Sequence, residues 1–230
     1  MATTTVRIGA AASVALTGIL LTGVYGLAAG GAGAPRSPLR GATAVKQPSL
    51  CKGYKTYGVP DVAPLNTRKT YKATVTTNKG VFTITFYPKQ APVTVTSFIF
   101  LAQHRYFDGV TFHRIVPTFV IQGGDPTGIG ICGPGYQFGT ENTGGKYYRG
   151  TVAMARTSDP HSNGSQFFVV LQDNGPLNQE PNYSIFGKVT SGMNVVDRIA
   201  AVRLGPNADG SEQSKPLEKV YMKSVRVTVN

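Results

Sequence analysis

Residues 112–125 read FHRIVPTFVIQGGD, and this stretch decides the fold. Phe112–Val116 and Phe119–Gln122 are both rich in β-branched and aromatic side chains, so each run predicts a short strand. Pro117 lies between them and has no N–H group to donate, which interrupts a hydrogen-bonded ladder. The sequence therefore predicts two strands separated by a break.

The break affects which side chains lie together. Side chains alternate along a strand, so Arg114 and Val116 share one face of the first strand. Val120 and Gln122 share one face of the second strand for the same reason. Because the alternation starts again after Pro117, both faces can point the same way. We therefore expect a fixed cation, an amide and apolar groups on a single surface.

The strand pattern continues on both sides of this stretch. Apolar residues at helical spacing predict helices over Val93–Tyr106, which Pro92 opens, and over Met193–Val202. Eight strands and two helices indicate a mainly β fold, a closed eight-stranded antiparallel β-barrel capped by two α-helices, because closure leaves no free strand edge. The first of the two strands above extends back to Val110, and the six further predicted strands are Tyr71–Thr77, Val81–Tyr87, Thr151–Ala155, Phe167–Leu171, Ser184–Val189 and Lys219–Val229.

Two later blocks add to the pattern. Residues 163–170 read NGSQFFVV, and residues 185–189 read IFGKV, followed by Gly192 and Met193. Together with residues 112–125, these blocks resemble the signature of the cyclophilins, the cyclophilin-type peptidyl-prolyl cis/trans isomerases. The similarity covers the chain from about Thr70 to Asn230. It implies a barrel of eight strands capped by two helices, and an enzyme that accelerates rotation about Xaa-Pro bonds.

The resemblance also assigns roles to individual residues. It makes Arg114 the catalytic hydrogen-bond donor, Gln122 the residue that holds Arg114 and binds the substrate backbone, and Phe119 part of the catalytic set. For substrate binding, the resemblance implies a proline pocket lined by Phe119, Val120, Phe168 and Leu177. It implies a groove for the flanking peptide, lined by Ala155, Arg156, Thr157 and Gln166. It places His113 and Tyr183 at the pocket rim.

The chemistry fits a guanidinium in this position. Rotation about a conjugated amide has a barrier of about 18–20 kcal/mol. No bond breaks, so we expect no nucleophile, general base, metal or cofactor. The catalyst must instead bind the twisted amide more tightly than the planar one. The twisted prolyl nitrogen accepts a hydrogen bond, which the permanently charged Arg114 is suited to donate.

The chain departs from the family pattern at four positions. Val120 stands where well-studied cyclophilins usually have Met, and Arg156 stands where they have Asn. Pro176 stands where many members have an aromatic residue, often Trp, and Tyr183 replaces a His that is common in eukaryotic members. The lost indole is a usual contact of cyclosporin, so we expect cyclosporin binding to be weakened.

Composition limits the organisation and the partners. The 230 residues, of which 41% are hydrophobic, suffice for one domain and an N-terminal extension. A formal net charge of +12 either attracts anionic surfaces or forms a solvated basic surface that aids solubility. We favour the second interpretation and expect no nucleic-acid partner, because the basic residues are scattered and no nucleic-acid motif is present. We expect a monomer that binds proline-containing polypeptides.

The N-terminal segment, residues 1–34, predicts export. Ile8–Gly33 contains no charged residue, which is typical of a membrane-spanning anchor or of a secretory signal peptide. Ala32-Gly33-Ala34 has the form of a cleavage site, but Pro35 would follow the cut, so we favour an uncleaved anchor. Either interpretation places the domain outside the cytoplasm. Basic residues at 36, 40 and 46 oppose this orientation, since they normally favour the inner side of a membrane.

Residues 35–69 precede the predicted domain, which spans 70–230. Residues 35–48 are rich in Pro, Gly and Ala and predict a flexible linker, and residues 49–68 predict an arm ahead of the barrel. Cys51 lies in the arm, and Cys132 lies in the glycine-rich loop Gly128–Gly135. In an exported chain the two cysteines either pair in a disulfide that ties the arm to the loop, or remain two unpaired thiols.

Three functions compete at this stage. The first is an extracytoplasmic prolyl isomerase that assists the folding of exported proteins, and the presence of Arg114 favours it. The second is a non-catalytic proline-peptide-binding module on the same barrel, which the altered residues Val120, Arg156 and Pro176 leave open. The third is a small-molecule barrel of the lipocalin type, and the block 112–125 argues against it, because nothing in lipocalin binding requires that block.

Overall fold

The computed structural model describes residues 36–141, 144–173, 175–179 and 182–230. The predicted anchor or signal segment, residues 1–34, lies outside the described residues. Within the described ranges, no helix combines the length and the apolar character needed to cross a bilayer.

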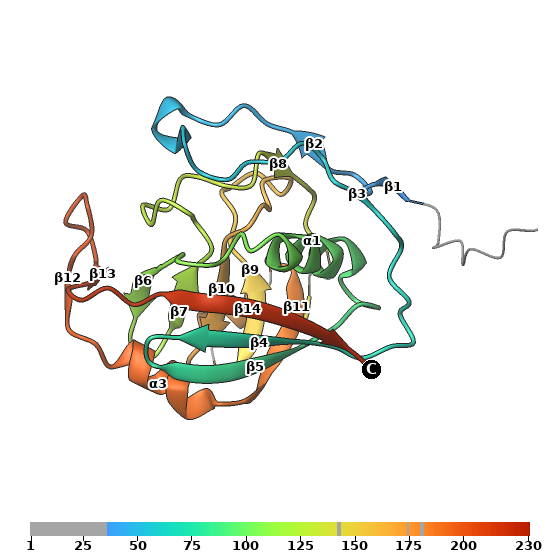
Figure 1. The fold of residues 1–230 in the computed structure, drawn as a ribbon. Helices are drawn as coiled ribbons and strands as arrows, with labels where there is room; N and C mark the ends of the chain where they lie inside the picture. The colour runs from blue at the N-terminus through green and yellow to red at the C-terminus, as the bar shows by residue number, and fades with distance from the viewer. Residues whose placement is uncertain (1–35, 142–143, 174, 180–181) are drawn as a thin grey trace, which may run out of the picture. The chain divides into compact units, whose positions relative to one another are not determined.

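Eight antiparallel strands form the main sheet in the order β14-β4-β5-β11-β9-β10-β7-β6 (Figure 1). All eight predicted strands are confirmed, with their ends shifted by a few residues. The last strand in the sequence, β14, lies beside the first strand of this sheet, β4. The bounds are β4 Tyr71–Thr77, β5 Gly80–Phe86, β6 Phe112–Val116, β7 Val120–Gly123, β9 Thr151–Met154, β10 Phe167–Val170, β11 Ile185–Ser191 and β14 Met222–Val229.

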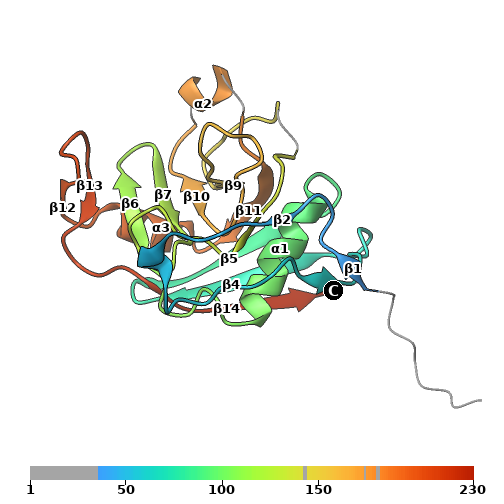
Figure 2. The same cartoon turned by 90° about the horizontal axis from the view of Figure 1, so that it is seen from above.

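The sheet is open, which corrects the prediction of a closed barrel. Its edge strands are β14 and β6. Backbone hydrogen bonds join these edges near the start of each strand, where Met222 N–H donates to Val110 and Gly109 N–H donates to Met222. Further along, a hairpin of β12 (Leu204–Pro206) and β13 (Gln213–Pro216) lies beside β6 (Figures 1 and 2). Because this hairpin occupies the space, no ladder links β6 to β14 within the described residues.

Both predicted helices are confirmed, as α1 (Pro92–Gln103) and α3 (Met193–Ala200). Pro92 occupies the first turn of α1, where its missing N–H costs nothing. The next two N–H groups, of Val93 and Thr94, donate to the carboxylate of Glu141 at 3.0 and 2.8 Å. Glu141 therefore caps the helix and compensates its dipole, as a carboxylate at a helix N-terminus does.

A third helix, α2, spans Gly175–Gln179 and was not predicted. It has five residues, and its Gly-Pro start is typical of a turn in sequence. Such a short helix carries too few apolar positions to show helical spacing.

Alternation along the strands divides the apolar side chains between two clusters. In the larger cluster, Phe98 of α1 stacks on Phe107, with 4.7 Å between ring centroids, and meets Phe167 edge-on at 5.5 Å. The smaller cluster includes Val120 and Phe168. The neighbours Phe167 and Phe168 thus enter different clusters, because successive side chains of β10 point to opposite faces.

The described part of the predicted linker and arm is paired both within itself and with the rest of the domain. β1 (Ser37–Pro38) pairs with β3 (Asp61–Val62). β2 (Thr43–Ala44) pairs with β8 (Tyr136–Gln137), and a 3-10 turn follows at Ser49–Cys51. The structure joins Cys51 to Cys132 in a disulfide across a sequence separation of 81 residues.

We expect the double substitution of Cys51 and Cys132 by Ser to lower the free energy of unfolding by about 4 kcal/mol, because a disulfide over a long loop restricts the unfolded chain. Guanidinium denaturation of both proteins under oxidising conditions measures the difference. Reductant is the control, since it should destabilise the wild type and leave the double variant unchanged. A loss below about 1 kcal/mol would show that the arm adds little to the domain.

Candidate functional site

A one-residue irregularity in β6 builds the site. Phe112 pairs with Gly123 and Arg114 pairs with Gln122, so the register shifts across His113. Such a bulge reverses the alternation of side chains. Phe112 therefore enters the main core, whereas Arg114 points to the opposite face.

The expected surface forms on that face. Arg114 lies opposite Gln122, and Val116 lies opposite Val120, so all four side chains point to the same side of the sheet. The strands are connected through Pro117 and Thr118, and Thr118 has a φ of 63°. Phe119 N–H donates to Val116 C=O at 3.0 Å and closes this turn. The prediction that both strands present one shared face is confirmed.

An apolar pocket opens on this face. Its lining comes from β6, β7, β10 and α2 and from loop residues, among them the two that follow β9. Phe168 meets Tyr183 edge-on at 5.4 Å. Arg156 lies over the Tyr183 ring at 5.4 Å and donates to the carbonyl of Asn182 at 2.9 Å, which fixes one wall. The residues that line this pocket are Arg114, Phe119, Val120, Gln122, Ala155, Arg156, Phe168, Leu177 and Tyr183.

Arg114 is held at the mouth of the apolar pocket by two groups. Its Nε and Nη2 donate to the carboxylate of Glu212 at 2.8 and 2.7 Å. Its Nη1 donates to Gln122 Oε1 at 3.4 Å, and the guanidinium lies 5.9 Å from the centre of the Phe119 ring. The hydrogen bonds from Arg114 hold the pKa of Glu212 below its usual range. Both side chains are about one-third exposed, at 33% and 31%.

Gln122 connects Arg114 to a neighbouring second pocket. Gln122 Nε2 donates to Gln166 Oε1 at 3.1 Å, and Gln166 Nε2 donates to the carbonyl of Gly130 at 2.9 Å. Gln122 and Gln166 both line the second pocket, together with Thr157 and Cys132. One chain of hydrogen bonds thus runs from the guanidinium to the loop that contains Cys132.

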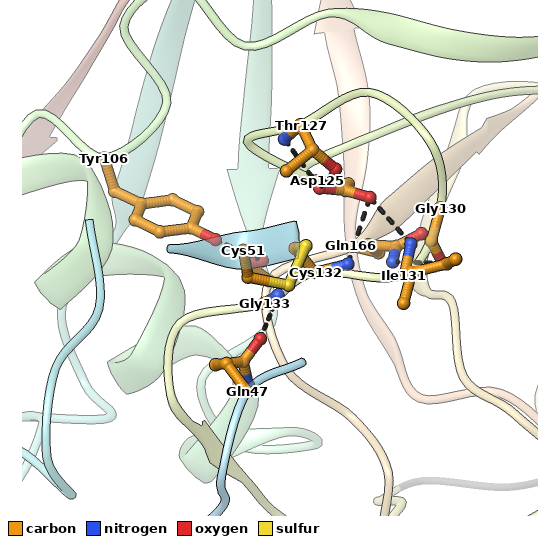
Figure 3. Close-up of a disulfide and its surroundings, with 11 residues drawn as sticks. Gln47, Cys51, Tyr106, Asp125, Thr127, Gly130, Ile131, Cys132, Gly133 and Gln166 are labelled. Carbon is orange, nitrogen blue, oxygen red and sulfur yellow. Dashed lines mark hydrogen bonds between the residues drawn. A yellow bond between two sulfur atoms is a disulfide. The ribbon is translucent and has the colours of Figure 1, made fainter. Parts of the chain in front are cut away.

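Asp125 holds that loop in shape (Figure 3). Its fully buried carboxylate accepts hydrogen bonds from Thr127 N–H at 2.7 Å, from Ile131 N–H at 2.7 Å and from Cys132 N–H at 3.2 Å. Gln47, in the predicted linker just ahead of the arm, accepts a hydrogen bond from Gly133 N–H at 3.0 Å, beside the disulfide. The loop that carries Gly130 is therefore anchored from the inside and from the arm.

Gly124 explains why this loop begins where it does. Its φ is +97°, and a Cβ atom there would collide with the backbone oxygen of Ser165. The Ser165 hydroxyl donates to the Gly124 carbonyl at 2.7 Å. Only glycine allows the two segments to approach this closely.

Comparison with known protein families identifies the family to which this chain belongs. A family model described as "Cyclophilin type peptidyl-prolyl cis-trans isomerase/CLD" matches residues 72–227. The chain belongs to the cyclophilin family.

Individual relatives agree with the cyclophilin assignment. Peptidyl-prolyl cis-trans isomerase-like 1 of Aspergillus fumigatus is 38% identical over 155 residues, which cover 66% of this chain and 91% of the relative. Peptidyl-prolyl cis-trans isomerase-like 2 of Cryptococcus neoformans is 35% identical over 162 residues, which cover 67% of this chain and 27% of the relative. This chain spans between 27% and 38% of the length of four such longer relatives.

A solved cyclophilin has the same fold. The crystal structure of a Cryptosporidium parvum cyclophilin-type peptidyl-prolyl cis-trans isomerase in the presence of the dipeptide Ala-Pro matches with a TM-score of 0.62 and 31% sequence identity. The match covers 69% of this chain and 99% of that chain.

The structure brings most of the predicted site residues of this cyclophilin together. Nine line the apolar pocket, and Thr157 and Gln166 line the adjoining second pocket. His113 stands apart from both sets. It lines a third hollow, which shares Arg114 and Gln122 with the apolar pocket and also includes Gly128 and Ile129.

Sequence reasoning missed two contributors to this cyclophilin site. Glu212 binds Arg114 from 98 residues further along the chain, and Gln47 lines the second pocket from the predicted linker. Neither residue belongs to the quoted motifs, and no local spacing connects it to the site. The turn residues Asn207-Ala-Asp-Gly210 predict a hairpin with Glu212 close to its turn, but they do not identify the partner of Glu212.

We expect His113 to titrate below its ordinary pKa of 6.5. Burial lowers the pKa of His113, Asp125 opposes the shift, and Arg114 adds to it. Since the unfolded chain then binds the proton more readily, this residue should reduce stability as the pH falls from about 6.5 to the native pKa. Its contribution to stability is complete above that window.

Histidine NMR signals followed against pH measure the native pKa, and His113→Phe assigns the resonance. The variant should lose the part of the pH dependence of unfolding that lies in this window. A native pKa at or above 6.5 would contradict the burial argument.

Proposed function

We propose that this chain is a peptidyl-prolyl cis-trans isomerase. The observation that carries the proposal is a guanidinium, Arg114, fixed at the mouth of an apolar pocket of suitable chemistry for a prolyl ring. Phe119, Val120, Phe168 and Leu177 supply apolar surface to this pocket. The crystallisation of a similar cyclophilin in the presence of Ala-Pro supports a proline-containing peptide as the occupant.

The arrangement can favour the twisted amide over the planar one. The pocket holds the prolyl ring while the peptide on the other side of the bond rotates. As the prolyl nitrogen becomes pyramidal, its lone pair accepts a hydrogen bond from the Arg114 guanidinium. Conjugation in the planar amide makes that nitrogen a poor acceptor, so the interaction stabilises the transition state selectively. A charged donor in a partly desolvated site makes this effect large.

Gln122 has two tasks in this mechanism. Its carbonyl oxygen accepts from Arg114, and its amide N–H group points to Gln166. The side chain therefore limits rotation of the guanidinium and borders the groove along which the substrate backbone would lie. Positioning of this kind reduces the loss of entropy on reaching the transition state.

We expect Arg114→Ala to reduce kcat/KM for a short Xaa-Pro peptide by at least about 100-fold, because it removes the donor that acts in the transition state. The cis-to-trans rate of the peptide with the full chain measures the effect. Arg203→Ala is the matched control, since Arg203 is exposed and forms no side-chain hydrogen bond among the described residues. It should leave the rate unchanged.

The same experiment separates isomerase from binding module. A folded wild type that binds the peptide without accelerating its isomerisation would refute the catalytic proposal. It would favour the non-catalytic proline-peptide-binding module that the substitutions at Val120 and Arg156 leave open.

We further propose that the domain acts outside the cytoplasm on exported proteins, held to the membrane by its N-terminal segment. The uncharged stretch Ile8–Gly33 supports this, and so does the Cys51–Cys132 disulfide, because disulfides persist in oxidising compartments. The basic residues after this stretch remain the opposing observation.

We expect the full chain to fractionate with membranes and to be digested by protease added to intact cells. Deletion of residues 1–34 should move it to the cytoplasm. Thiol alkylation of the full chain before reduction should leave Cys51 and Cys132 unmodified. A protease-protected, fully alkylated protein would refute export.

A further inference from the structure

Glu212 forms the closest contacts of Arg114. The two residues meet through a pair of parallel hydrogen bonds, from Nε at 2.8 Å and from Nη2 at 2.7 Å. Paired bonds of this kind fix both the position and the plane of a guanidinium, which a single bond does not. By comparison, the bond from Nη1 to Gln122 is long, at 3.4 Å.

The hairpin of β12 and β13 holds Glu212 in place. Asn207 N–H donates to the Glu212 carbonyl at 2.8 Å, and Glu212 N–H donates to Asn207 Oδ1 at 3.2 Å. The buried Ser214 beside it helps to hold the pKa of the Glu212 carboxyl below its usual range. The backbone of Glu212 is therefore fixed at both its N–H and its C=O group, which presents the carboxylate to Arg114.

The pairing with Glu212 leaves one nitrogen of the guanidinium, Nη1, to interact with other groups. Nε and Nη2 are occupied by Glu212, so Nη1 is the nitrogen directed to Gln122, which itself lines the apolar pocket. Glu212 itself does not line that pocket. The contact that links Glu212 to this pocket is its pair of hydrogen bonds with Arg114.

We propose that Glu212 is a positioning residue for the isomerase reaction, which aims Arg114 Nη1 at the prolyl nitrogen of the substrate. This inference rests on the proposed function. Arginine has several rotatable bonds, and holding one rotamer in advance avoids losing that freedom in the transition state. Glu212 thus contributes to the rate, and peptide affinity depends on the pocket.

Steady-state kinetics of wild type, Glu212→Ala and Glu212→Gln on one Xaa-Pro tetrapeptide test the proposal. Glu212→Ala should lower kcat by about tenfold with KM changed less than about twofold, because positioning acts on the transition state. Glu212→Gln should have an intermediate kcat, about threefold below that of the wild type, because its amide oxygen can accept one of the two hydrogen bonds from Arg114.

Glu218→Gln is the matched control. Glu218 also lies in the C-terminal part of the chain and forms a single ion pair, with Lys79 at 2.6 Å. The change removes the same charge and should leave kcat unchanged. Melting temperatures of all variants verify that they are folded.

The NMR signal of the Arg114 Nε–H group provides a readout that a purely structural role would not move. It should be protected from exchange in the wild type and lose protection in Glu212→Gln, while the affinity for a proline peptide stays constant. A folded Glu212→Ala with wild-type kcat would overturn the inference. An inactive wild type would overturn the proposed function as well, so the two failures are distinguishable.

Discussion

A strand has only two faces, and the domain depends on how its strands divide their side chains between them. The inner face of the sheet must fill a core, so it holds Phe112, Ile115 and Phe167. The outer face of the same strands is then free to hold polar groups. One extra residue at His113 moves Arg114 from the core face to the site face. A regular strand would have buried this charge among phenylalanines, at a cost that few proteins sustain.

The site is rigid because its polar groups form a continuous network. The network runs from the Glu212 hairpin through Arg114, Gln122 and Gln166 to the carbonyl of Gly130. Asp125 and the disulfide hold the loop that carries this carbonyl. The central strands and the C-terminal hairpin thus meet at one guanidinium, and the arm is connected to it through the disulfide-bonded loop. Satisfied networks of this kind specify a single arrangement of side chains.

Much of this could be predicted from sequence, where the determining signal is local. Alternating apolar residues gave all eight strands, and the block 112–125 gave the shared face of Arg114 and Gln122. Closure of the sheet could not be predicted, because it depends on whether β14 or a hairpin occupies the edge of β6. Glu212 and Gln47 were missed because their contacts join distant segments, and no periodicity encodes such pairs. Whether Phe168 lines the core or the pocket also needed the register, since the residue type alone fits both.

The position of β14 has a consequence for how the chain reaches this structure. β4 and β14 are the first and last strands of the main sheet in sequence, yet they are neighbours, and Thr70 and Asn230 exchange backbone hydrogen bonds at 2.9 and 3.0 Å. During synthesis β4 emerges long before its partner. Until then it presents an unpaired edge, and such edges favour association with other chains. A pairing this distant in sequence forms slowly, because a long loop must close first. A protein that we propose to assist folding therefore has a vulnerable interval in its own folding.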